Sequence, residues 1–488
     1  MVRFVSSHPA GKAETMTPVL VNPIEGTSLI ADPIYQYIVM TDRWKGTEGA
    51  TERDVIDTPW LQRLRRIYQL QSARWVFPSA EHSRFQHSLG TMHVAGEFAR
   101  HLYPFFRRVF QDTIPSEPYV EELLRLGGLL HDVGHGPFCH FFDEHVLSRF
   151  GLTHEMMSQR IILEKLGGMI KSIRRSPHGI LDEGEQLEPE YIAFLIRKPE
   201  GPPAPGYPPW LHQLQQLFRG IFTVDNIDYV LRDSYMTGVA VGPVDWKRML
   251  HYTLCHPEGL ALDKRGASAL NMFLNARLYL YTNVYYHRTT RSIDLQLGEI
   301  FSRTIQIVFP YNPVDRLDHY CNLTDWSLIE GVHRWQKSRN PEKRCLACKW
   351  EDLLTRRLRW RSAYETVLTI KGLEIGRAGF VRKEEVEQSI REGLPKDARD
   401  IDFHVDMAHH DPRPLNPLHA EDSPLLIYDP VSKRVSREAL EELFEYIPAK
   451  VAICRVYGSL PQYNTILREA ATRTLGSSDH FGSYPTNV

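Results

Sequence analysis

The chain has 488 residues, 42% of them hydrophobic, which is enough for one large domain or for two. Lys and Arg total 58 against 60 acidic residues, so no overall basic excess indicates nucleic-acid binding, although local positive charge is compatible with it. Six scattered cysteines do not suit a disulfide-dense secreted protein, and no apolar stretch is long enough to cross a bilayer. We therefore expect a soluble, cytoplasmic protein with no membrane contact.

Residues 1–25 show no periodicity and are predicted to be a flexible tail, with a helical core following over residues 26–340. A helix is expected from Asp57-Thr58-Pro59 toward Leu70, because a capping residue followed by proline is typical of a helix start. The proline-rich segment 200–209 is predicted to be a surface loop. The other segments with helical periodicity are His87–Tyr103, Val120–Leu130, Leu211–Tyr235, Ala267–His287, Ile293–Phe309 and Asp352–Tyr364.

The C-terminal part has a different texture, and a smaller α+β lobe is predicted over residues 341–470, followed by a flexible tail over 471–488. Short β-branched runs predict strands at Thr366–Ile370, Pro424–Tyr428 and Val451–Tyr457, around a helix at Ser436–Tyr446. The predicted fold class is therefore mainly α, with this lobe appended to the helical core.

Histidine usage points to a metal site, since nine of the 22 histidines fall within residues 82–154. His87, His131, Asp132 and Asp225 each lie in a predicted helix or directly after one. Two imidazoles and two carboxylates suit a divalent ion such as Fe, Mn, Zn or Ni, and they leave positions for water and a phosphate oxygen. These four residues are the candidate metal ligands.

The adjacent pair His131 and Asp132 can share one ion only if the preceding helix ends there, because neighbouring residues on a helix point about 100° apart. Gly134 and Gly136 supply that break. An isolated His-Asp pair commonly arises by chance. The apolar helix before it and the glycines after it favour the functional interpretation.

A second polar group follows, and we predict that it performs acid–base catalysis. His140 and Asp143 are three residues apart and share a helical face, so the carboxylate can orient the imidazole. The alternative is that these residues support the metal ligands or are merely solvated. The group consists of His135, His140, Asp143 and His154.

Two further helical faces carry polar residues that suit a ligand. Asp225, Tyr229, Arg232 and Asp233 share one face, although an internal pair of Arg232 with Asp228 or Asp233 explains the arginine equally well. A second stripe consists of Arg277, Tyr281, Tyr285 and Arg288. Arginine and phenol groups suit phosphate oxygens and a sugar, but such a stripe is more often plain packing.

Several strings together resemble the HD-domain deoxynucleoside triphosphate triphosphohydrolases, a family that includes bacterial dGTPases and the vertebrate SAM-and-HD-domain enzyme. The resemblance runs from about Ile30 to Tyr457 and implies an HD-domain helical core. The resembling strings are Ile56–Pro59 with Gln62–Arg65, Val76–Pro78, Arg84–Gly90, Leu130–Phe138 and Asp225–Tyr229.

The resemblance also implies roles for individual residues. His87, His131, Asp132 and Asp225 take the metal positions, and His135, His140, Asp143 and His154 surround the attacked phosphate. Arg84, Tyr229 and Arg277 hold phosphates, Gln69, Leu70 and Asp233 line the sugar pocket, and Tyr285 crowds the 2′ position.

Departures from the family pattern bear on the substrate and its regulation. Asn226 stands where the vertebrate enzyme has a lysine, so one phosphate contact is expected from elsewhere, with Arg288 as the candidate. Asp57, Gln62 and Arg65 match positions near the vertebrate enzyme's activating-nucleotide site, and a structural role at a helix start explains them as well.

The sequence thus leads to the hypothesis that this is a dNTP triphosphohydrolase. A metal-bound water attacks the α-phosphorus, His140 with Asp143 or His154 protonates the departing 5′-oxygen, and triphosphate leaves. The metal is left open among Fe, Mn, Zn, Ni, Co and Mg, with an additional Mg on the triphosphate. The partners implied are a homo-oligomer (dimer, tetramer or hexamer) and an activating nucleotide.

Two rival functions remain open. One is an HD-superfamily phosphohydrolase for another phosphoester, such as an rNTP, a nucleoside monophosphate, a cyclic dinucleotide or a nucleic-acid end. The other is a nucleotide-sensing or nucleic-acid-binding protein whose metal is structural. Cys345 and Cys348 have the spacing of half a zinc site, but no second pair follows at a suitable distance.

Overall fold

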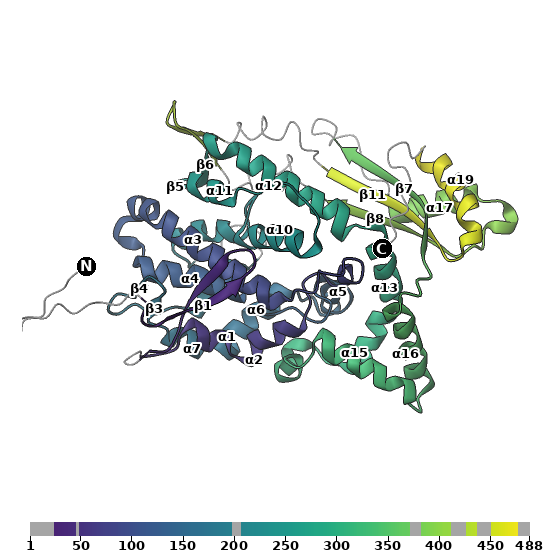
Figure 1. Cartoon of the computed structure of the whole chain (residues 1–488), viewed down its shortest axis with the longest axis horizontal. Coiled ribbons are helices and arrows are strands. Elements are labelled where there is room, and N and C mark those ends of the chain that lie inside the picture. Colours follow the sequence, from purple (N-terminus) through teal and green to yellow (C-terminus); the bar gives the residue numbers. More distant parts are fainter. Residues whose placement is uncertain are drawn as a thin grey trace, which may run out of the picture.

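The computed structural model describes residues 24–44, 48–197, 206–370, 382–410, 426–436 and 450–476. The protein is mainly α-helical with a small α+β lobe, as predicted. Figure 1 shows the helical body and, at one end of it, the lobe. The lobe is formed by β7 (Arg361–Ile370), β8 (Phe403–His410), β11 (Lys450–Gly458), α17 (Lys383–Gly393) and α19 (Asn464–Leu475). None of the helices in the described part of the chain is both long and apolar enough to cross a membrane.

The body begins with a hairpin and a set of short helices. Strands β1 (Thr27–Asp32) and β2 (Gln36–Thr41) pair antiparallel. Thr58 caps α2 (Pro59–Gln62) with proline at its first turn, which confirms the predicted helix start. The helix does not continue to Leu70, because the chain tightens into a 3₁₀ turn at Arg63–Arg66 and then turns away. α1 (Glu52–Ile56) precedes it, and a 3₁₀ turn at Ala73–Trp75 follows.

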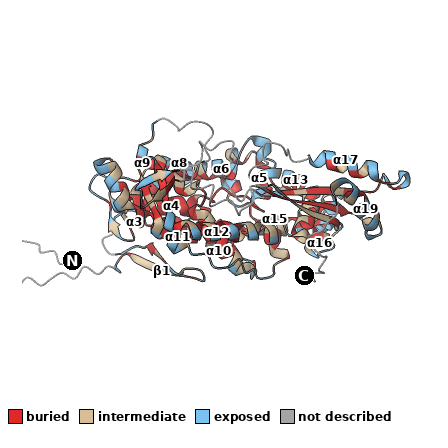
Figure 2. Ribbon diagram, turned by 90° about the horizontal axis from the view of Figure 1, so that it is seen from above, coloured by how far each residue is buried: buried red, intermediate tan, exposed pale blue. Residues whose placement is uncertain are grey.

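Two long helices, α3 (Arg84–Phe110) and α4 (Glu117–Leu130), form the centre of the body. α3 starts at a capping box between Ser83 and Gln86, and α4 starts where Ser116 accepts from the backbone N–H of Tyr119. A Cβ at Gly128 would lie 2.7 Å from the carbonyl oxygen of Thr91, so a glycine is needed for this close packing. Figure 2 shows buried residues throughout this central layer.

Shorter helices follow the central pair along the chain. They are α5 (His140–His145), α6 (His154–Ile161), α7 (Gly167–Ser172), α8 (Pro189–Ile196), α9 (Pro209–Leu214) and α10 (Val224–Thr237). Small elements between them are 3₁₀ turns at Leu147–Phe150 and Gln215–Phe218, a π-turn at Ile162–Leu166, and strands β3 (Arg175–Ser176) and β4 (Gly179–Ile180). The segment Leu211–Tyr235, predicted to be helical, is interrupted: the chain leaves helical geometry at Arg219, and Thr223 caps a new helix, α10. Of the predicted loop, residues 200–205 lie outside the described residues, and Pro209 already begins α9.

The body closes with a hairpin and a second layer of helices. The hairpin is β5 (Thr253–His256) with β6 (Gly259–Asp263). The helices are α11 (Trp246–Tyr252), α12 (Ala267–Leu280) with a π-turn at Tyr281–Tyr285, α13 (Arg288–Val308), α14 (Leu317–Tyr320), α15 (Asp325–Arg334) and α16 (Pro341–Leu354). The helix predicted over Asp352–Tyr364 is wrong: α16 ends at Leu354, and strand β7 begins at Arg361.

The lobe has its own small core around a three-stranded antiparallel sheet in the order β7-β11-β8. Its strands are β7 (Arg361–Ile370), β8 (Phe403–His410) and β11 (Lys450–Gly458), packed against α17 (Lys383–Gly393) and α19 (Asn464–Leu475). α19 includes residues 471–475, which were predicted to belong to the tail, because Ala470 and Ala471 pack into this core.

One predicted lobe strand belongs to the body. β9 (Leu426–Asp429) and β10 (Arg434–Ser436) join the sheet β10-β9-β6-β5, where β9 runs parallel to β6. Side chains of α16, including Trp350, also lie in the larger core. The division of the chain at residues 340 and 341 stays a prediction. The predicted helix 436–446 lies outside the described residues beyond Ser436, as do the tail residues 1–23 and 477–488.

Candidate active site

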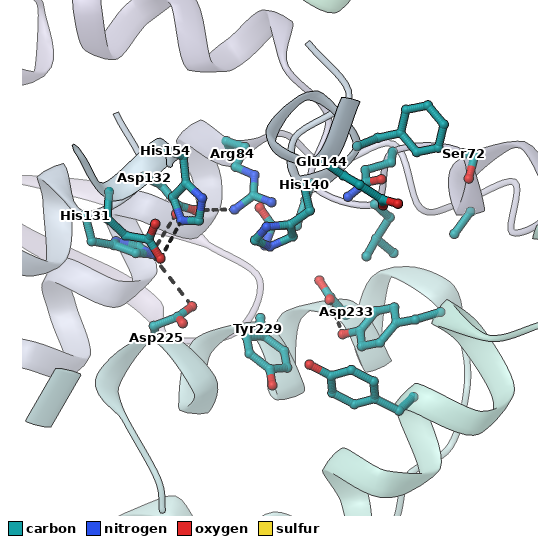
Figure 3. A pocket seen from close by; sticks show the side chains of 18 of the residues that line it. Ser72, Arg84, His131, Asp132, His140, Glu144, His154, Asp225, Tyr229 and Asp233 are labelled. Carbon is teal, nitrogen blue, oxygen red and sulfur yellow. Dashed lines mark hydrogen bonds and ion pairs between the residues drawn. The ribbon is translucent and has the colours of Figure 1, made fainter. Parts of the chain in front are cut away.

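A cavity of about 630 Å³ opens between the short helices α5 and α6 on one side and α10 and the π-turn Tyr281–Tyr285 on the other. His131, Asp132 and Asp225 lie at one end, and Ser72 lies at the opposite end, as Figure 3 shows. Tyr229 and Asp233 line the wall between the two ends. The cavity is therefore elongated, with its most strongly charged group at one end.

At that end the four predicted metal ligands come together. The Nε2 atoms of His87 and His131 are 3.2 Å apart, and Asp225 Oδ1 lies 3.0 Å from His87 Nε2 and 3.7 Å from His131 Nε2. Asp132 lies 3.3 Å from His131 Nε2 through Oδ1 and 3.6 Å from His87 Nε2 through Oδ2. The ligand atoms of His87, His131 and Asp225 lie close enough together to hold a metal ion, and Asp132, which also pairs with Arg84, lies beside them.

The outer faces of both imidazoles fit this interpretation. His87 Nδ1 lies 2.8 Å from Asp228 Oδ2, and His131 Nδ1 lies 2.8 Å from the carbonyl oxygen of Gly128. Because these acceptors take the Nδ1 protons, both Nε2 atoms face the shared centre, where each can bind either a proton or a metal ion, as in protein metal sites. Burial lowers the pKa of His87, but hydrogen bonds and charges of Asp225 and Asp228 outweigh it and raise the pKa to about 10. The centre therefore favours a positive charge.

The chain positions His131 and Asp132 by ending α4 directly before them, as predicted. Gly134 is required there, because a Cβ would lie 2.2 Å from the carbonyl oxygen of His154. The fully buried Arg63 donates to the carbonyl oxygens of Val133 at 3.2 Å and His135 at 2.8 Å, and it also bonds carbonyls of residues 320–323. The guanidinium of Arg63 thus fixes the loop that carries His131 and Asp132.

The second predicted group also comes together, next to the first. His154 Nδ1 hydrogen-bonds Asp143, which lies 3.5 Å from His140 Nδ1. The rings of His135 and His154 stack at 3.8 Å, and His135 Nε2 lies 3.3 Å from Asp132 Oδ1. His140 and His154 line the cavity, whereas the buried His135 is behind them. These donors also lie close enough to hold a cation.

Arg84, at the start of α3, lines the cavity and forms an ion pair with Asp132. Its Nε lies 3.0 Å from Cys139 Sγ. Although burial lowers the pKa of Arg84, Asp132 and Cys139 raise it above the ordinary value, so the residue remains a cation. It therefore bridges the open cavity and the four candidate metal ligands, His87, His131, Asp132 and Asp225, which we call the metal group.

The residues predicted to line a sugar pocket lie in the middle of the cavity. Asp233 Oδ1 lies 2.8 Å from His82 Nε2, and the Tyr285 hydroxyl donates to Asp233 Oδ2 at 2.5 Å. Gln69 and Leu70 line the same space. Arg232 does not face it: this residue bonds Asp228 through two nitrogens and Asp32 through a third, so the structural alternative is correct for Arg232.

Two predicted phosphate contacts lie elsewhere. Neither Arg277 nor Arg288 is among the described residues that line the cavity. The buried Arg277 donates to the carbonyl oxygen of Ile221 at 3.3 Å and to Asn226 Oδ1 at 3.2 Å. Arg288 begins α13, and its carbonyl accepts from the Tyr457 hydroxyl at 2.7 Å. Their geometry gives no support to a direct phosphate contact.

Sequence reasoning missed several cavity residues. Ser72 and Asp294 hydrogen-bond each other at the end away from the metal group, and Arg197 and Arg219 line another part of the wall. None of them lies in a motif. Arg197 directly follows α8, and Arg219 directly follows the 3₁₀ turn Gln215–Phe218. Only the fold brings these two positions together.

Residues 84–191, which carry most of the site, match the HD domain family. The match contains His87, His131 and Asp132, while Asp225 lies beyond it. The chain is 31% identical over 325 residues to "Uncharacterized protein YwfO" of Bacillus subtilis, covering 62% of this chain and 65% of that protein.

Named relatives support the resemblance predicted from the sequence. The chain is 28% identical to the deoxynucleoside triphosphate triphosphohydrolase SAMHD1 homolog of Dictyostelium discoideum, over 59% of this chain and 52% of that protein. It is 25% identical to deoxynucleoside triphosphate triphosphohydrolase SAMHD1 of Mus musculus, over 83% and 65%. The chain thus spans roughly half to two thirds of these relatives. The resemblance to HD-domain dNTP triphosphohydrolases is confirmed.

A solved structure shares the fold. A hypothetical protein from Aquifex aeolicus aligns with a TM-score of 0.65 and 22% identity, covering 91% of this chain and 99% of that chain. At this identity the likeness bears on the fold alone. It extends over both the helical body and the lobe.

Proposed function

We propose that the protein hydrolyses deoxynucleoside triphosphates to a deoxynucleoside and triphosphate. The observation that carries the proposal is the adjacency of two groups beside one elongated cavity: His87, His131 and Asp225 with Asp132 next to them, and the histidines and aspartate of the second group. The cavity then continues past Tyr229 and Asp233 toward Ser72, away from the metal group. The names of the relatives point to the same substrate class.

The metal group would hold one divalent ion through His87, His131, Asp132 and Asp225, among Fe, Mn, Zn, Ni, Co and Mg. Such an ion supplies Lewis-acid catalysis and lowers the pKa of a water molecule. Its ligands on this chain are pre-oriented by Asp228 and by the carbonyl of Gly128. The same group places this chemistry beside Arg84, which offsets negative charge on a phosphate chain.

The second group handles the proton of the leaving group. The oxygen of a water molecule bonds to the α-phosphorus, and the bond from phosphorus to the 5′-oxygen breaks. The 5′-oxygen takes a proton from His140, while the attacking water releases a proton to solvent, from which His140 is reprotonated. Asp143 orients that imidazole and His154 together. His135, buried behind them, has its pKa lowered far below the usual value, first by burial and then by Arg84 and His154, and it therefore stays neutral.

The test is product analysis. We expect the full chain, loaded separately with Mn, Fe, Co or Mg, to convert dNTPs to deoxynucleosides and triphosphate, resolved by ion-exchange chromatography. Pyrophosphate with a monophosphate as products, or hydrolysis of rNTPs alone, would assign the site to another phosphoester. Four intact dNTPs after hours with a metal-loaded protein would end the proposal.

Removing the leaving-group proton donor should slow the reaction without removing the metal. We expect His140→Asn and Asp143→Asn to lower kcat by roughly 100- to 10,000-fold. Metal content should stay at the wild-type value, because the single ion of the proposal is bound by His87, His131, Asp132 and Asp225. His145→Asn is the matched control, since His145 lies on the same helix outside the cavity wall. Unchanged kcat in the His140 and Asp143 variants would remove the second group from the mechanism.

Sugar discrimination provides a separate prediction. Tyr285 lines the cavity and its hydroxyl donates to Asp233 Oδ2, and the family resemblance implies that its ring crowds the 2′ position of the sugar. We expect Tyr285→Ala to raise the ratio of kcat/KM for rNTPs to that for dNTPs by about tenfold or more. Tyr285→Phe keeps the ring and should change the ratio much less. An unchanged ratio in the alanine variant would show that discrimination arises elsewhere.

The partners of the protein are also part of the proposal. The family resemblance favours a homo-oligomer, whether dimer, tetramer or hexamer, and an activating nucleotide. Light scattering of the full chain with and without added nucleotides measures both properties.

A further inference from the structure

Two arginines line the cavity and differ from the other cationic residues there. Arg219 is half-buried and Arg197 is exposed, and neither forms an ion pair or side-chain hydrogen bond with any residue that the structure describes. Arg84, by contrast, pairs with Asp132, and Arg291 pairs with Asp406 through two nitrogens. The cavity wall therefore contains two positive charges that the described protein does not neutralise.

The fold brings these arginines together from separate elements. Arg197 follows the last residue of α8, and Arg219 follows the 3₁₀ turn Gln215–Phe218. The two ends are tied because Gln215 Nε2 donates to the carbonyl oxygen of Phe194, in the last turn of α8. Both side chains are therefore held on one part of the wall.

This part of the wall adjoins the metal group. Phe218 lies against Gly127 in the last turn of α4, where a Cβ would approach the Phe218 ring to 2.9 Å. The next residue, Gly128, holds His131 through its carbonyl oxygen. On the other side, only the turn to Thr223 separates Arg219 from α10, whose first turn contains Asp225.

The environment of Arg219 favours an anion. Its Nε is buried and has no hydrogen-bond acceptor in the described part of the chain. Burial, and then repulsion from Arg197, lower the pKa of Arg219 to about 10, so the guanidinium is charged at neutral pH and incompletely solvated. A buried donor without an acceptor destabilises a protein, and a phosphate oxygen would satisfy it.

We propose that Arg219, assisted by Arg197, binds the outer phosphates of the substrate. This inference rests on the proposed function, which places the α-phosphate at the adjoining metal group. It supplies the cationic contact that Asn226 cannot make, and it replaces Arg288 and Arg277, which lie outside the cavity wall. An arginine fork also suits the terminal oxygens of a phosphate chain better than an ammonium does.

The test measures binding of inorganic triphosphate, pyrophosphate and phosphate to the full chain by calorimetry. We expect Arg219→Gln to weaken triphosphate binding by about tenfold or more and orthophosphate binding much less. Arg197→Gln should have a smaller effect in the same direction, and Arg219→Lys should restore part of the affinity. Arg334→Gln is the matched control, because Arg334 is exposed and, among the residues that the structure describes, its side chain pairs only with Glu330 of its own helix.

Two readouts separate binding from a structural role and from the proposed function. Arg219→Gln should keep or raise Tm, because it removes a cation that is repelled by Arg197 and lacks a hydrogen-bond acceptor. Triphosphate affinity equal to that of the wild type would overturn the inference. A loss of affinity that a lower Tm explains would overturn it as well. If Arg219→Gln loses triphosphate binding but the wild type hydrolyses no dNTP, the phosphate site stands and the dNTPase proposal fails. If the wild type hydrolyses dNTPs and Arg219→Gln keeps the same KM, the dNTPase proposal stands and the phosphate site at Arg219 fails.

Discussion

Replacing Asp225 with asparagine is expected to remove the bound metal and to lower phosphoester hydrolysis by roughly 1,000-fold. A catalytic metal ion contributes several kcal/mol to the stabilisation of the transition state, and each 1.4 kcal/mol is a factor of ten in rate. Asp225 Oδ1 lies within 3.7 Å of both ligand nitrogens, so its charge is close enough to offset that of a divalent ion. An amide keeps the shape of the side chain but loses this charge.

Metal analysis by mass spectrometry and a kcat measurement on the same preparation check this result. Asp112→Asn is the control, because Asp112 is an exposed aspartate outside the cavity wall. The fold should persist, since Asp225 is only partly buried and its strongest contacts are with the other metal ligands. A variant with full metal content and full activity would show that Asp225 is not a ligand.

The largest effect on stability is expected for Asp228→Asn. The buried Asp228 accepts from Arg232 Nε and from a terminal nitrogen of Arg232, both at 2.9 Å, and it also orients His87. Removing one partner of a buried ion pair costs about 3–5 kcal/mol. Losing the residue that orients a ligand histidine lowers metal affinity by roughly 10- to 100-fold. We therefore expect both Tm and metal affinity to fall.

Asp32→Asn is the matched control for that variant, because Asp32 also bonds the buried Arg232, at 2.8 Å, but does not touch His87. It should lower Tm while leaving metal affinity at the wild-type value. Equal losses of metal affinity in the two variants would show that Asp228 acts only through stability. Burial raises the pKa of Asp228, but Arg232 and His87 outweigh it and lower the pKa to about 2, so the stabilisation holds at neutral pH and is lost as the pH falls through that value.

The sequence predicted the metal group because its residues lie in recognisable local contexts. The apolar run before His131 and the glycines after it define a helix end, and the structure has that end at Leu130. The helical face of Asp225, Tyr229 and Asp233 also faces the cavity as the spacing predicts. Local periodicity is sufficient where a residue's position depends on one helix.

The failures arise where the position depends on contacts between distant segments. The break at Arg219 follows from a 3₁₀ turn held against α8, which no local pattern reveals. Likewise β9 leaves the predicted lobe because its partner is β6, about 160 residues earlier in the chain. Arg277 has the spacing of a phosphate ligand, but Asn226 and the carbonyl of Ile221 hold it behind the wall.

An anomalous difference map from crystals of the full chain grown with Mn²⁺ tests the central claim most directly. We predict one strong peak in contact with the Nε2 atoms of His87 and His131 and with carboxylate oxygens of Asp132 and Asp225. A map with no peak between these four side chains, or with manganese bound only elsewhere, would contradict the account.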